Sequence, residues 1–316
     1  TQKDSLDWSY RSKNRPDFPE NRARAIYSPA GLADWGDAGA KYFERHKGDY
    51  DFILSRSMPP ESHEAALKIK RKNRNVKWIA SFGDPIADNP FELIRLNGLK
   101  ALPWSLRRQK MIVACKRRMK KGRALWRAVC KSADTIIFNN PYQRDYMLKD
   151  CADEIKKKAL ILPHSFKKEF FDGEKALPNK KLTMSFTGHL DGVRTPAVFL
   201  EAVAELKKKL PGLVDIFEVN LYGNLPDSCE IDSEIVKVRG SVDYFESLEI
   251  MRRSDWLLHI DALLPGAENI FFAAKLADYM GSGRPIFAVT MEKGAAADIL
   301  AGYGNAVICL TKDDIL

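Results

Sequence analysis

Short apolar runs alternate with amphipathic, charged stretches along most of the chain. The apolar runs are short and end at turn-forming residues, as Gly83-Asp84-Pro85 ends the run at 76–82. Short apolar strands between helical patterns are typical of a parallel α/β sheet that is buried on both faces. We predict strands at 50–55, 76–82, 135–138, 159–162, 182–187, 214–222, 236–238, 256–260 and 285–289, and helices at 38–46, 61–71, 141–148, 196–210, 244–253 and 275–280.

The alternation occurs twice, and a polar stretch with Gly and Pro separates the two series. This stretch reads FFDGEKALPNKK at 170–181, within a chain of 316 residues that is long enough for two domains. We therefore predict an N-terminal domain at 1–170, a linker at 171–181 and a C-terminal domain at 182–316.

Composition excludes several classes of protein. The chain is 45% hydrophobic and 29% charged, which is typical of a globular protein. Its five cysteines are scattered without a CxxC pair, which argues against a disulfide framework or a thiolate zinc site and favours a reducing compartment. We find no apolar run long enough to span a bilayer, no signal peptide and no cluster at metal-ligand spacing. We expect a cytoplasmic protein without a bound metal.

The positive charge is concentrated in one segment. Residues 93–133 hold 13 Lys or Arg and no Asp or Glu, which leaves 38 basic against 42 acidic residues elsewhere. Apolar residues recur there at helical spacing, so we predict one amphipathic helix with a cationic face. These residues are Ile112, Cys115, Met119, Gly122, Trp126 and Val129.

Three interpretations of the basic segment compete. Its charges are simply solvated, or they bind the phosphates of nucleic acid, or they dock on an anionic membrane where Trp104 and Trp126 suit the interface. We favour the membrane, because a complete absence of acids over 41 residues exceeds what solvation needs.

The first candidate for chemistry is the turn after the strand at 182–187. It reads GHLDGVRTP at 188–196 and leads into a helix. A glycine-rich turn before a helix offers backbone N–H groups to an anion, and Arg194 would add a positive charge suited to phosphate. The turn is neither GxGxxG nor a P-loop, so an ordinary tight turn with a surface arginine remains an equal alternative.

The second candidate is the segment around Lys275 and Asp278, which lie three residues apart and therefore on one helix face. One interpretation is an exposed ion pair of little energetic weight. The functional interpretation places Lys275 on a phosphate and Asp278 on two ribose hydroxyls.

The sequence KLADYMGSGRPIFAV at 275–289 resembles a stretch of GT-B glycosyltransferases, especially the retaining family 4 group. Further segments follow in the order that this family uses. They are DFILSRSMPPESHEAALKIK, WIASFGDPIADNP, SADTIIFNN, ILPHSF, FTGHLDGVRTP and VRGSVDYFESLEIMRRSDWLL. The resemblance implies two Rossmann-like domains facing across a cleft, with a nucleotide-sugar donor held mainly by the C-terminal one.

The resemblance also implies roles for individual residues. Gly188 and Arg194 would approach the donor diphosphate with Lys275 as a second cation, His189 would contact the donor, and Asp278 would bind the ribose. The base would be lined by Arg239, Gly240 and Ser241.

Two further positions follow from the resemblance. The acid that the family usually places eight residues before its ribose-binding acid falls on Ile270, and Glu268 is close but out of register. Asp84 falls where related enzymes carry residues that line the cleft.

Taken together, we expect a retaining glycosyltransferase that transfers a sugar from a nucleotide diphosphate sugar to a lipid-linked or cell-envelope glycan. Arg194 and Lys275, with Asp84, would be its catalytic residues, and it would need no cofactor. We expect it at the inner face of the cytoplasmic membrane, docked through 93–133. Two alternatives stay open: a nucleic-acid-binding α/β protein, and a glycosyltransferase-like domain that binds a nucleotide sugar without catalysis.

Overall fold

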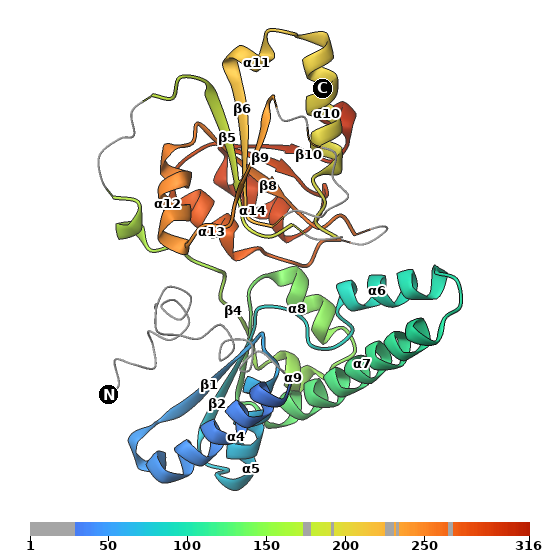
Figure 1. The fold of residues 1–316 in the computed structure, drawn as a ribbon. Helices are drawn as coiled ribbons and strands as arrows, with labels where there is room; N and C mark the ends of the chain where they lie inside the picture. Colours follow the sequence, from blue (N-terminus) through green and yellow to red (C-terminus); the bar gives the residue numbers. More distant parts are fainter. Residues whose placement is uncertain (1–28, 173–177, 191–192, 225–230, 232–233, 265–267) are drawn as a thin grey trace. The chain divides into compact units, whose positions relative to one another are not determined.

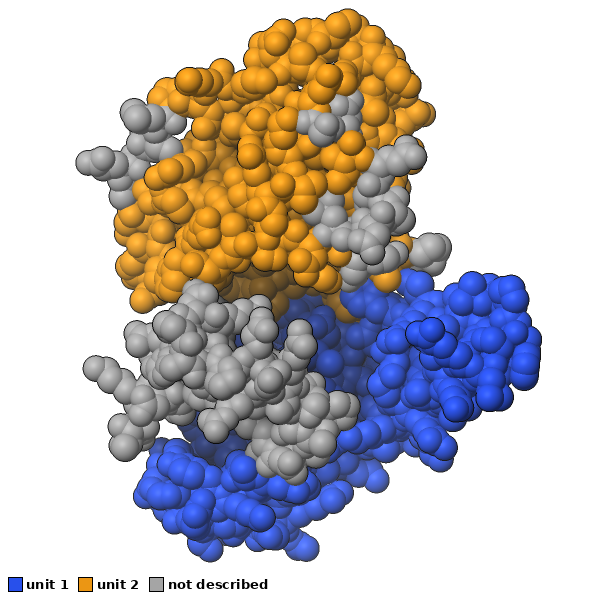
Figure 2. Space-filling model, viewed as in Figure 1, with its two compact units in different colours: residues 1–162 blue, residues 163–316 orange. Residues whose placement is uncertain are grey.

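The computed structural model describes the backbone of residues 29–172, 178–190, 193–224, 231, 234–264 and 268–316. The chain forms two compact units, residues 1–162 and 163–316 (Figures 1 and 2). We call them unit 1 and unit 2.

Unit 1 contains a parallel sheet of four strands in the order β1-β2-β3-β4. The strands are β1 (Phe52–Ser57), β2 (Lys77–Phe82), β3 (Thr135–Phe138) and β4 (Ala159–Ile161). The helices are α4 (Pro29–His46), α5 (Glu61–Lys72), α6 (Pro90–Ala101), α7 (Leu106–Ser132), α8 (Pro141–Leu148) and α9 (Asp153–Lys156), with a 3₁₀ turn at Lys47–Asp49. Six of the predicted strands and helices in this unit agree in type with the structure and lie within two residues of it at each end, but α4 extends nine residues further towards the N-terminus than predicted.

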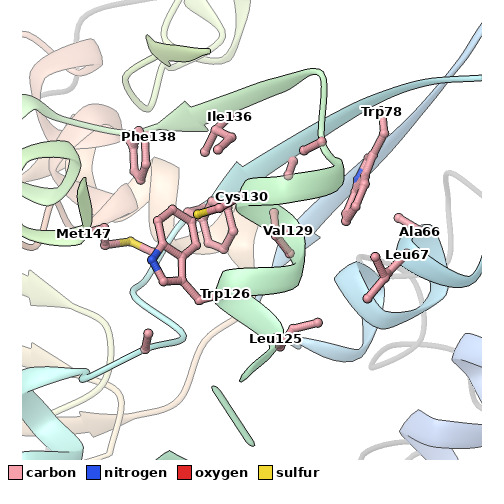
Figure 3. Close-up of a cluster of buried hydrophobic side chains, with 14 of the residues drawn as sticks. Ala66, Leu67, Trp78, Leu125, Trp126, Val129, Cys130, Ile136, Phe138 and Met147 are labelled. Atoms are coloured by element: carbon pink, nitrogen blue, oxygen red, sulfur yellow. The ribbon is translucent and has the colours of Figure 1, made fainter. Parts of the chain in front are cut away.

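The core of unit 1 lies on one face of this sheet. Trp78 and Phe82 of β2 and Phe138 of β3 belong to it together with Trp126 of α7. The Phe82 and Trp126 ring centroids are 5.2 Å apart, and Figure 3 shows Trp126 on the same side of the cluster as Phe138, with Trp78 on the other side. Side chains of α5, α7 and α8 enter the same cluster. Strands in sequential order, joined by right-handed crossovers, place all their connecting helices on the same side of the sheet.

The opposite face of the sheet is not covered by any helix of the described residues. Phe52 and Leu54 of β1 and Leu160 of β4 are exposed on it. The expectation that both faces of every strand are buried is therefore wrong for unit 1. The strand order is the physical reason, because it gives no crossover to the second face.

The basic segment also differs from the prediction. It forms two helices, α6 and α7, because Pro103 cannot continue a helix and Ser105 caps the next one, accepting a hydrogen bond from Arg108 N at 3.1 Å. The predicted apolar face is confirmed, since Ile112, Cys115, Met119, Trp126 and Val129 are buried and Gly122 packs closely. The placement of Trp126 at a membrane interface is wrong, because its side chain fills the core of unit 1.

Unit 2 contains a parallel sheet of six strands in the order β10-β9-β8-β5-β6-β7. The strands are β5 (Leu182–Thr187), β6 (Phe217–Tyr222), β7 (Val236–Gly240), β8 (Trp256–Ile260), β9 (Ile286–Val289) and β10 (Ala306–Cys309). The helices are α10 (Ala197–Lys209), α11 (Leu213–Ile216), α12 (Tyr244–Arg253), α13 (Ala274–Gly281), α14 (Ala295–Tyr303) and α15 (Lys312–Ile315), with a 3₁₀ turn at Lys168–Phe170. Numbered within unit 2, this is the Rossmann order 3-2-1-4-5-6.

The central strands of unit 2 are buried on both faces. All residues from Met184 to Thr187 in β5 and from Leu257 to Ile260 in β8 are buried. Residues 214–216, predicted as strand, belong to the single turn α11 instead, because Gly212 begins a helical turn before β6. The elements α14, β10 and α15 were not predicted.

The units divide at Leu162, earlier than the predicted linker at 171–181. The segment after the division packs within unit 2: the His164 and Phe272 ring centroids are 5.1 Å apart, and Phe166 and Phe171 lie against Gly281. Within the linker, residues 173–177 are outside the described residues, and the domain boundaries stay a prediction.

Cys115, Cys130, Cys151 and Cys309 are free thiols, and Cys229 is outside the described residues. Among the helices that the structure describes, none is long and apolar enough to cross a membrane.

Candidate active site

The carboxyl ends of β5 and β8 form the topological switch point of the unit 2 sheet. The chain leaves β5 towards β6 on one side and leaves β8 towards β9 on the other. Crevices at such points are where open α/β sheets bind ligands. Gly188 follows β5 here and Asp261 follows β8.

Lys275, in the first turn of α13, lies directly over Gly188. A Cβ atom added to Gly188 would stand 2.8 Å from Lys275 Nζ and 3.2 Å from Lys275 Cδ. The ammonium also lies 3.7 Å from the centroid of the Phe186 ring, in a cation–π contact. The two predicted motifs, 87 residues apart in sequence, therefore meet at the end of β5.

The loops after β5, β6 and β7 are in close backbone contact. Gly188 N donates to Tyr222 O at 2.9 Å, and Gly223 N donates to Gly240 O at 2.8 Å. Gly223 has φ +124°, and a Cβ there would stand 1.6 Å from Gly188 O. Glycine is required at this contact, and the turn at 188 is held in place by its neighbours.

A buried histidine and aspartate lie behind this turn. His259 Nε2 is 3.9 Å from Asp261 Oδ2, and both side chains are almost completely buried. Burial lowers the pKa of His259, Asp261 opposes that change, and the charges of Lys275 and Arg194 lower the pKa further. Arg194 lies in the connection from β5 to α10 and Lys275 in the first turn of α13, so both belong to the carboxyl end of the sheet.

Asp261 is held as a carboxylate. Burial alone would raise its pKa, but the interactions with His259, the Ala262 amide and the Thr290 hydroxyl outweigh burial and lower it. Ala262 N donates to Oδ1 at 2.8 Å and Thr290 Oγ1 donates to Oδ2 at 3.0 Å. A negative charge is thus fixed beside His259 in the interior of unit 2.

Asp278 lies one turn after Lys275 on α13 and is half-buried. Tyr244 of α12 donates its hydroxyl to Asp278 Oδ1 at 3.2 Å. Burial raises the pKa of Asp278 and the Tyr244 hydrogen bond lowers it, with burial the larger effect. The next residue, Tyr279, is fully buried and accepts a hydrogen bond from Thr187 N at 2.9 Å, which fixes α13 to the end of β5.

The segment before α13 is anchored by Asn269. Its Nδ2 donates to Ala262 O at 3.2 Å, and its Oδ1 accepts from Phe271 N at 2.9 Å. Ile270 is buried, whereas Glu268 is exposed. The position where the resemblance calls for an acid therefore holds a core side chain.

The remaining predicted donor contacts are spread along the edge of the sheet. His189 and Gly240 are exposed, and Ser241 Oγ donates to Asn224 Oδ1 at 3.3 Å. Arg239 instead turns towards β6, where its guanidinium donates to Asn220 Oδ1 at 2.7 Å and Glu218 Oε1 at 3.1 Å. These partners hold Arg239 against β6, and its contact with the donor base stays a prediction.

Asp84 follows β2 at the carboxyl end of the unit 1 sheet. Its main-chain carbonyl accepts a hydrogen bond from Ser57 Oγ at 3.2 Å, and the neighbouring Gly83 O accepts from Asn139 Nδ2 at 2.9 Å. The turn that carries Asp84 is therefore joined to the ends of β1 and β3.

Sequence reasoning missed His259, Asp261, Asn269 and Tyr279. The first two stand at the carboxyl end of a predicted strand, and this position was the available signal for them. The partner of Tyr279, Thr187, is distant in sequence, and the local pattern did not mark Asn269, which bonds to Ala262 and Phe271. Among the described residues, no group of three or more His, Cys, Asp or Glu side chains is arranged to hold a metal ion.

No family model and no curated protein matches this sequence. Solved structures do match the fold. OtsA in its apo form is 12% identical with a TM-score of 0.60, over 90% of this chain and 68% of its own. A UDP-forming α,α-trehalose-phosphate synthase from Burkholderia xenovorans is 11% identical with a TM-score of 0.56, over 92% and 70%. TarM is 10% identical with a TM-score of 0.50, over 88% and 51%.

These neighbours are glycosyltransferases of the GT-B fold, with two Rossmann-like domains. This chain has the GT-B fold. The predicted fold class, α/β with two Rossmann-like domains, is confirmed.

Proposed function

We propose that this GT-B chain is a glycosyltransferase that binds a nucleotide diphosphate sugar at the carboxyl end of the unit 2 sheet. The observation that carries the proposal is the approach of Lys275 Nζ to Gly188, within 2.8 Å of where a Cβ would stand. It places a cation over a turn without a side chain, at the switch point where such sheets bind ligands. A UDP-forming synthase among the structural neighbours supports a uridine diphosphate sugar as the first donor to test.

In the proposed reaction, the bond between the sugar C1 and the diphosphate oxygen breaks, and a bond between C1 and an acceptor hydroxyl oxygen forms. The acceptor proton leaves towards the departing diphosphate. Lys275 and Arg194 stabilise the negative charge that develops on the diphosphate, because fixed cations act strongly where charge appears in the transition state. Asp278 accepts the ribose hydroxyls, and the proposal includes no metal.

The acceptor and the stereochemistry are further parts of the proposal. The ordered segments that resemble retaining family 4 enzymes support retention at C1, and we propose a lipid-linked or cell-envelope glycan as acceptor. Asp84 is the residue of unit 1 that we assign to the reaction, and His189, Arg239, Gly240, Ser241 and Glu268 are assigned to donor contacts.

One observation favours a second candidate, a domain that binds a nucleotide sugar without transferring it. Ile270 is buried at the position where the resemblance calls for an acid. An isoleucine side chain has no carboxylate, so Ile270 cannot accept hydrogen bonds from the sugar hydroxyls of a donor as an acid would. Binding and transfer therefore need separate measurements.

The test measures binding first. We expect one of the four nucleotides UDP, GDP, dTDP and CMP to raise the melting temperature, because a ligand that binds only the native state stabilises it. Lys275→Ala should weaken this binding about tenfold or more, since it removes a charge-assisted contact to phosphate. Donor hydrolysis or transfer, measured with the matching sugar nucleotide, separates the enzyme from the binding domain.

The chain offers matched controls. Lys208→Ala removes an exposed lysine of α10, and Gly212→Ala adds a methyl group at a glycine with no atom within 4 Å of the new Cβ. Both should leave binding unchanged, whereas Gly188→Ala should weaken it by displacing Lys275. Wild-type affinity in Lys275→Ala and Arg194→Ala together would contradict the proposed donor site.

A further inference from the structure

The helices α6 and α7 form a hairpin that leaves the unit 1 sheet (Figure 1). It has its own apolar cluster, separate from the core in Figure 3, made of Leu96, Leu99, Ile112, Cys115 and Met119. The connection between the helices, residues 102–105, is therefore supported by the hairpin itself. We call residues 100–110 the hairpin tip.

Large apolar side chains are exposed together at the hairpin tip. Leu102 is 56% exposed, Trp104 is 71% exposed and Leu106 is 64% exposed. Trp104 has the largest exposed fraction of any large apolar side chain that the structure describes. Three such residues within five positions are unusual for a surface whose only contact is water.

The charges of the hairpin divide into two groups. Nearer the sheet, three cations of α7 have acidic partners: Arg118 with Glu92, Lys121 with Glu64 and Arg123 with Asp88, at 2.8–3.0 Å. At the tip, Lys100, Arg107 and Lys110 are exposed and have no acidic partner within the described part of the chain. The unbalanced positive charge therefore coincides with the exposed apolar side chains.

The backbone of the tip is held in a defined turn. The Arg108 guanidinium donates to the carbonyl of Leu102, and Ser105 Oγ accepts from Arg108 N at 3.1 Å. These bonds close the connection on itself and leave Trp104 projecting. A rigid tip loses less conformational entropy on docking than a loose loop would.

We propose that the hairpin tip docks on an anionic lipid surface, with Trp104, Leu102 and Leu106 at the boundary of headgroups and acyl chains. Lys100, Arg107 and Lys110 lie among the anionic headgroups. Cations beside exposed Trp and Leu match the interfacial binding mode, in which apolar burial and electrostatic attraction act together. Nucleic acid would use the cations and offers bases that stack on an aromatic ring, but it gains nothing from the two exposed leucines beside Trp104.

The test is co-sedimentation of the full chain with vesicles of pure phosphatidylcholine or of an equimolar mixture with phosphatidylglycerol. We expect binding only to the mixed vesicles. The double variant Leu102→Ser with Leu106→Ser should weaken it about tenfold, since each loses apolar area from the interface. Its control is Leu210→Ser with Ile216→Ser, two residues of unit 2 that are 55% and 64% exposed.

The charges are tested separately. Lys100→Ala, Arg107→Ala and Lys110→Ala together should weaken binding about tenfold or more, because each basic residue near an anionic surface contributes. The control removes three exposed cations nearer the sheet: Lys120, Arg127 and Lys131. Equal loss in both triple variants would overturn the assignment to the tip, and so would unchanged vesicle binding in the Leu102 and Leu106 variant.

The last measurement is binding of the full chain to a duplex DNA or RNA oligonucleotide. Salt-sensitive binding to it that exceeds vesicle binding and ignores the leucine substitutions would overturn the lipid proposal. Circular dichroism of each variant checks that α6 and α7 are intact. The proposal is independent of the donor site, so nucleotide binding by Lys275 remains as in the wild type in every tip variant.

Discussion

The two sheets of this chain are both parallel, but they are covered differently. In unit 1, burial alternates along β2, where Trp78, Ala80 and Phe82 are buried and their neighbours are not. In unit 2, four consecutive residues of β8 are buried. The same type of strand therefore has one buried face in the first sheet and two in the second.

Strand order explains the difference. The sequential order of unit 1 sends every right-handed crossover to one face, whereas the reversal at β5 and β8 sends crossovers to both faces in unit 2. The reversal that covers both faces is also the switch point where Gly188 and Lys275 meet. In this fold, the order of strands decides both where the core lies and where a ligand site can form.

The largest expected effect on the free energy of unfolding comes from making the same Leu→Ala substitution in each sheet. Leu258→Ala in β8 should cost about 2–5 kcal/mol of unfolding free energy, because it leaves a cavity between two covered faces. Leu160→Ala in β4, on the open face of unit 1, should change it by about 0.5 kcal/mol or less. Hydrogen exchange resolved by segment measures each unit separately. A cost at Leu160 as large as that at Leu258 would show that something covers the open face.

The sequence predicted the strands and helices better than their arrangement. Runs such as Leu182–Thr187 are specified locally, by apolar residues and a following glycine, and their bounds match the structure. The open face of unit 1 could not be predicted, because Leu54 and Leu258 both lie in short apolar runs and their burial depends on where their strands stand in the sheet. The strand of Leu54 is at the edge of its sheet, whereas the strand of Leu258 is central.

The candidate site divides in the same way. Lys275 and Gly188 were found because each belongs to a local motif, whereas Tyr279 acts through Thr187, which is far away in sequence. The prediction that Trp126 lies at a membrane interface was wrong, because periodicity identifies an apolar helix face but not what that face packs against.

The next effect concerns a histidine on the covered face of unit 1. His63 is fully buried, its Nδ1 lies 2.7 Å from Ser55 Oγ, and its ring stacks on Phe82. Burial lowers the pKa of His63 from 6.5 to about 4. Between these pH values the imidazole of His63 is protonated in the unfolded chain but neutral in the native state. The free energy of unfolding is therefore unaffected by His63 above pH 6.5 and falls as the pH drops from 6.5 towards 4.

The expected loss over that pH range is about 3 kcal/mol, at about 1.4 kcal/mol per pKa unit. Urea denaturation at a series of pH values measures it. His63→Gln should flatten this slope whatever its effect on stability at neutral pH, whereas His46→Gln at an exposed position should keep it. A wild-type slope in the His63 variant would assign the acid sensitivity to other groups.

The third effect tests how α7 seats on the covered side of unit 1. A Cβ at Gly122 would stand 1.9 Å from Ile86 O, in the turn after β2. Gly122→Ala should therefore cost about 1–3 kcal/mol, since a backbone contact has to open. Gly98→Ala in α6 has no atom within 4 Å of its new Cβ and should stabilise the helix by about 0.5–1 kcal/mol. Opposite signs in thermal melts confirm the contrast, and a stabilised Gly122→Ala contradicts it.

The smallest effect is at the buried end of β5 in unit 2. Tyr279→Phe keeps the ring but removes the hydroxyl that accepts a hydrogen bond from Thr187 N at 2.9 Å. We expect a cost of about 1 kcal/mol, the net value of a typical buried hydrogen bond. Tyr303→Phe removes a hydroxyl that donates to Arg284 O at 3.0 Å in a less buried position and should cost less. Because Tyr279 fixes α13 to β5, its loss should also weaken nucleotide binding at Lys275, whereas Tyr303→Phe should not. A Tyr279→Phe variant with reduced stability and unchanged nucleotide affinity would show that α13 is positioned by its apolar contacts alone.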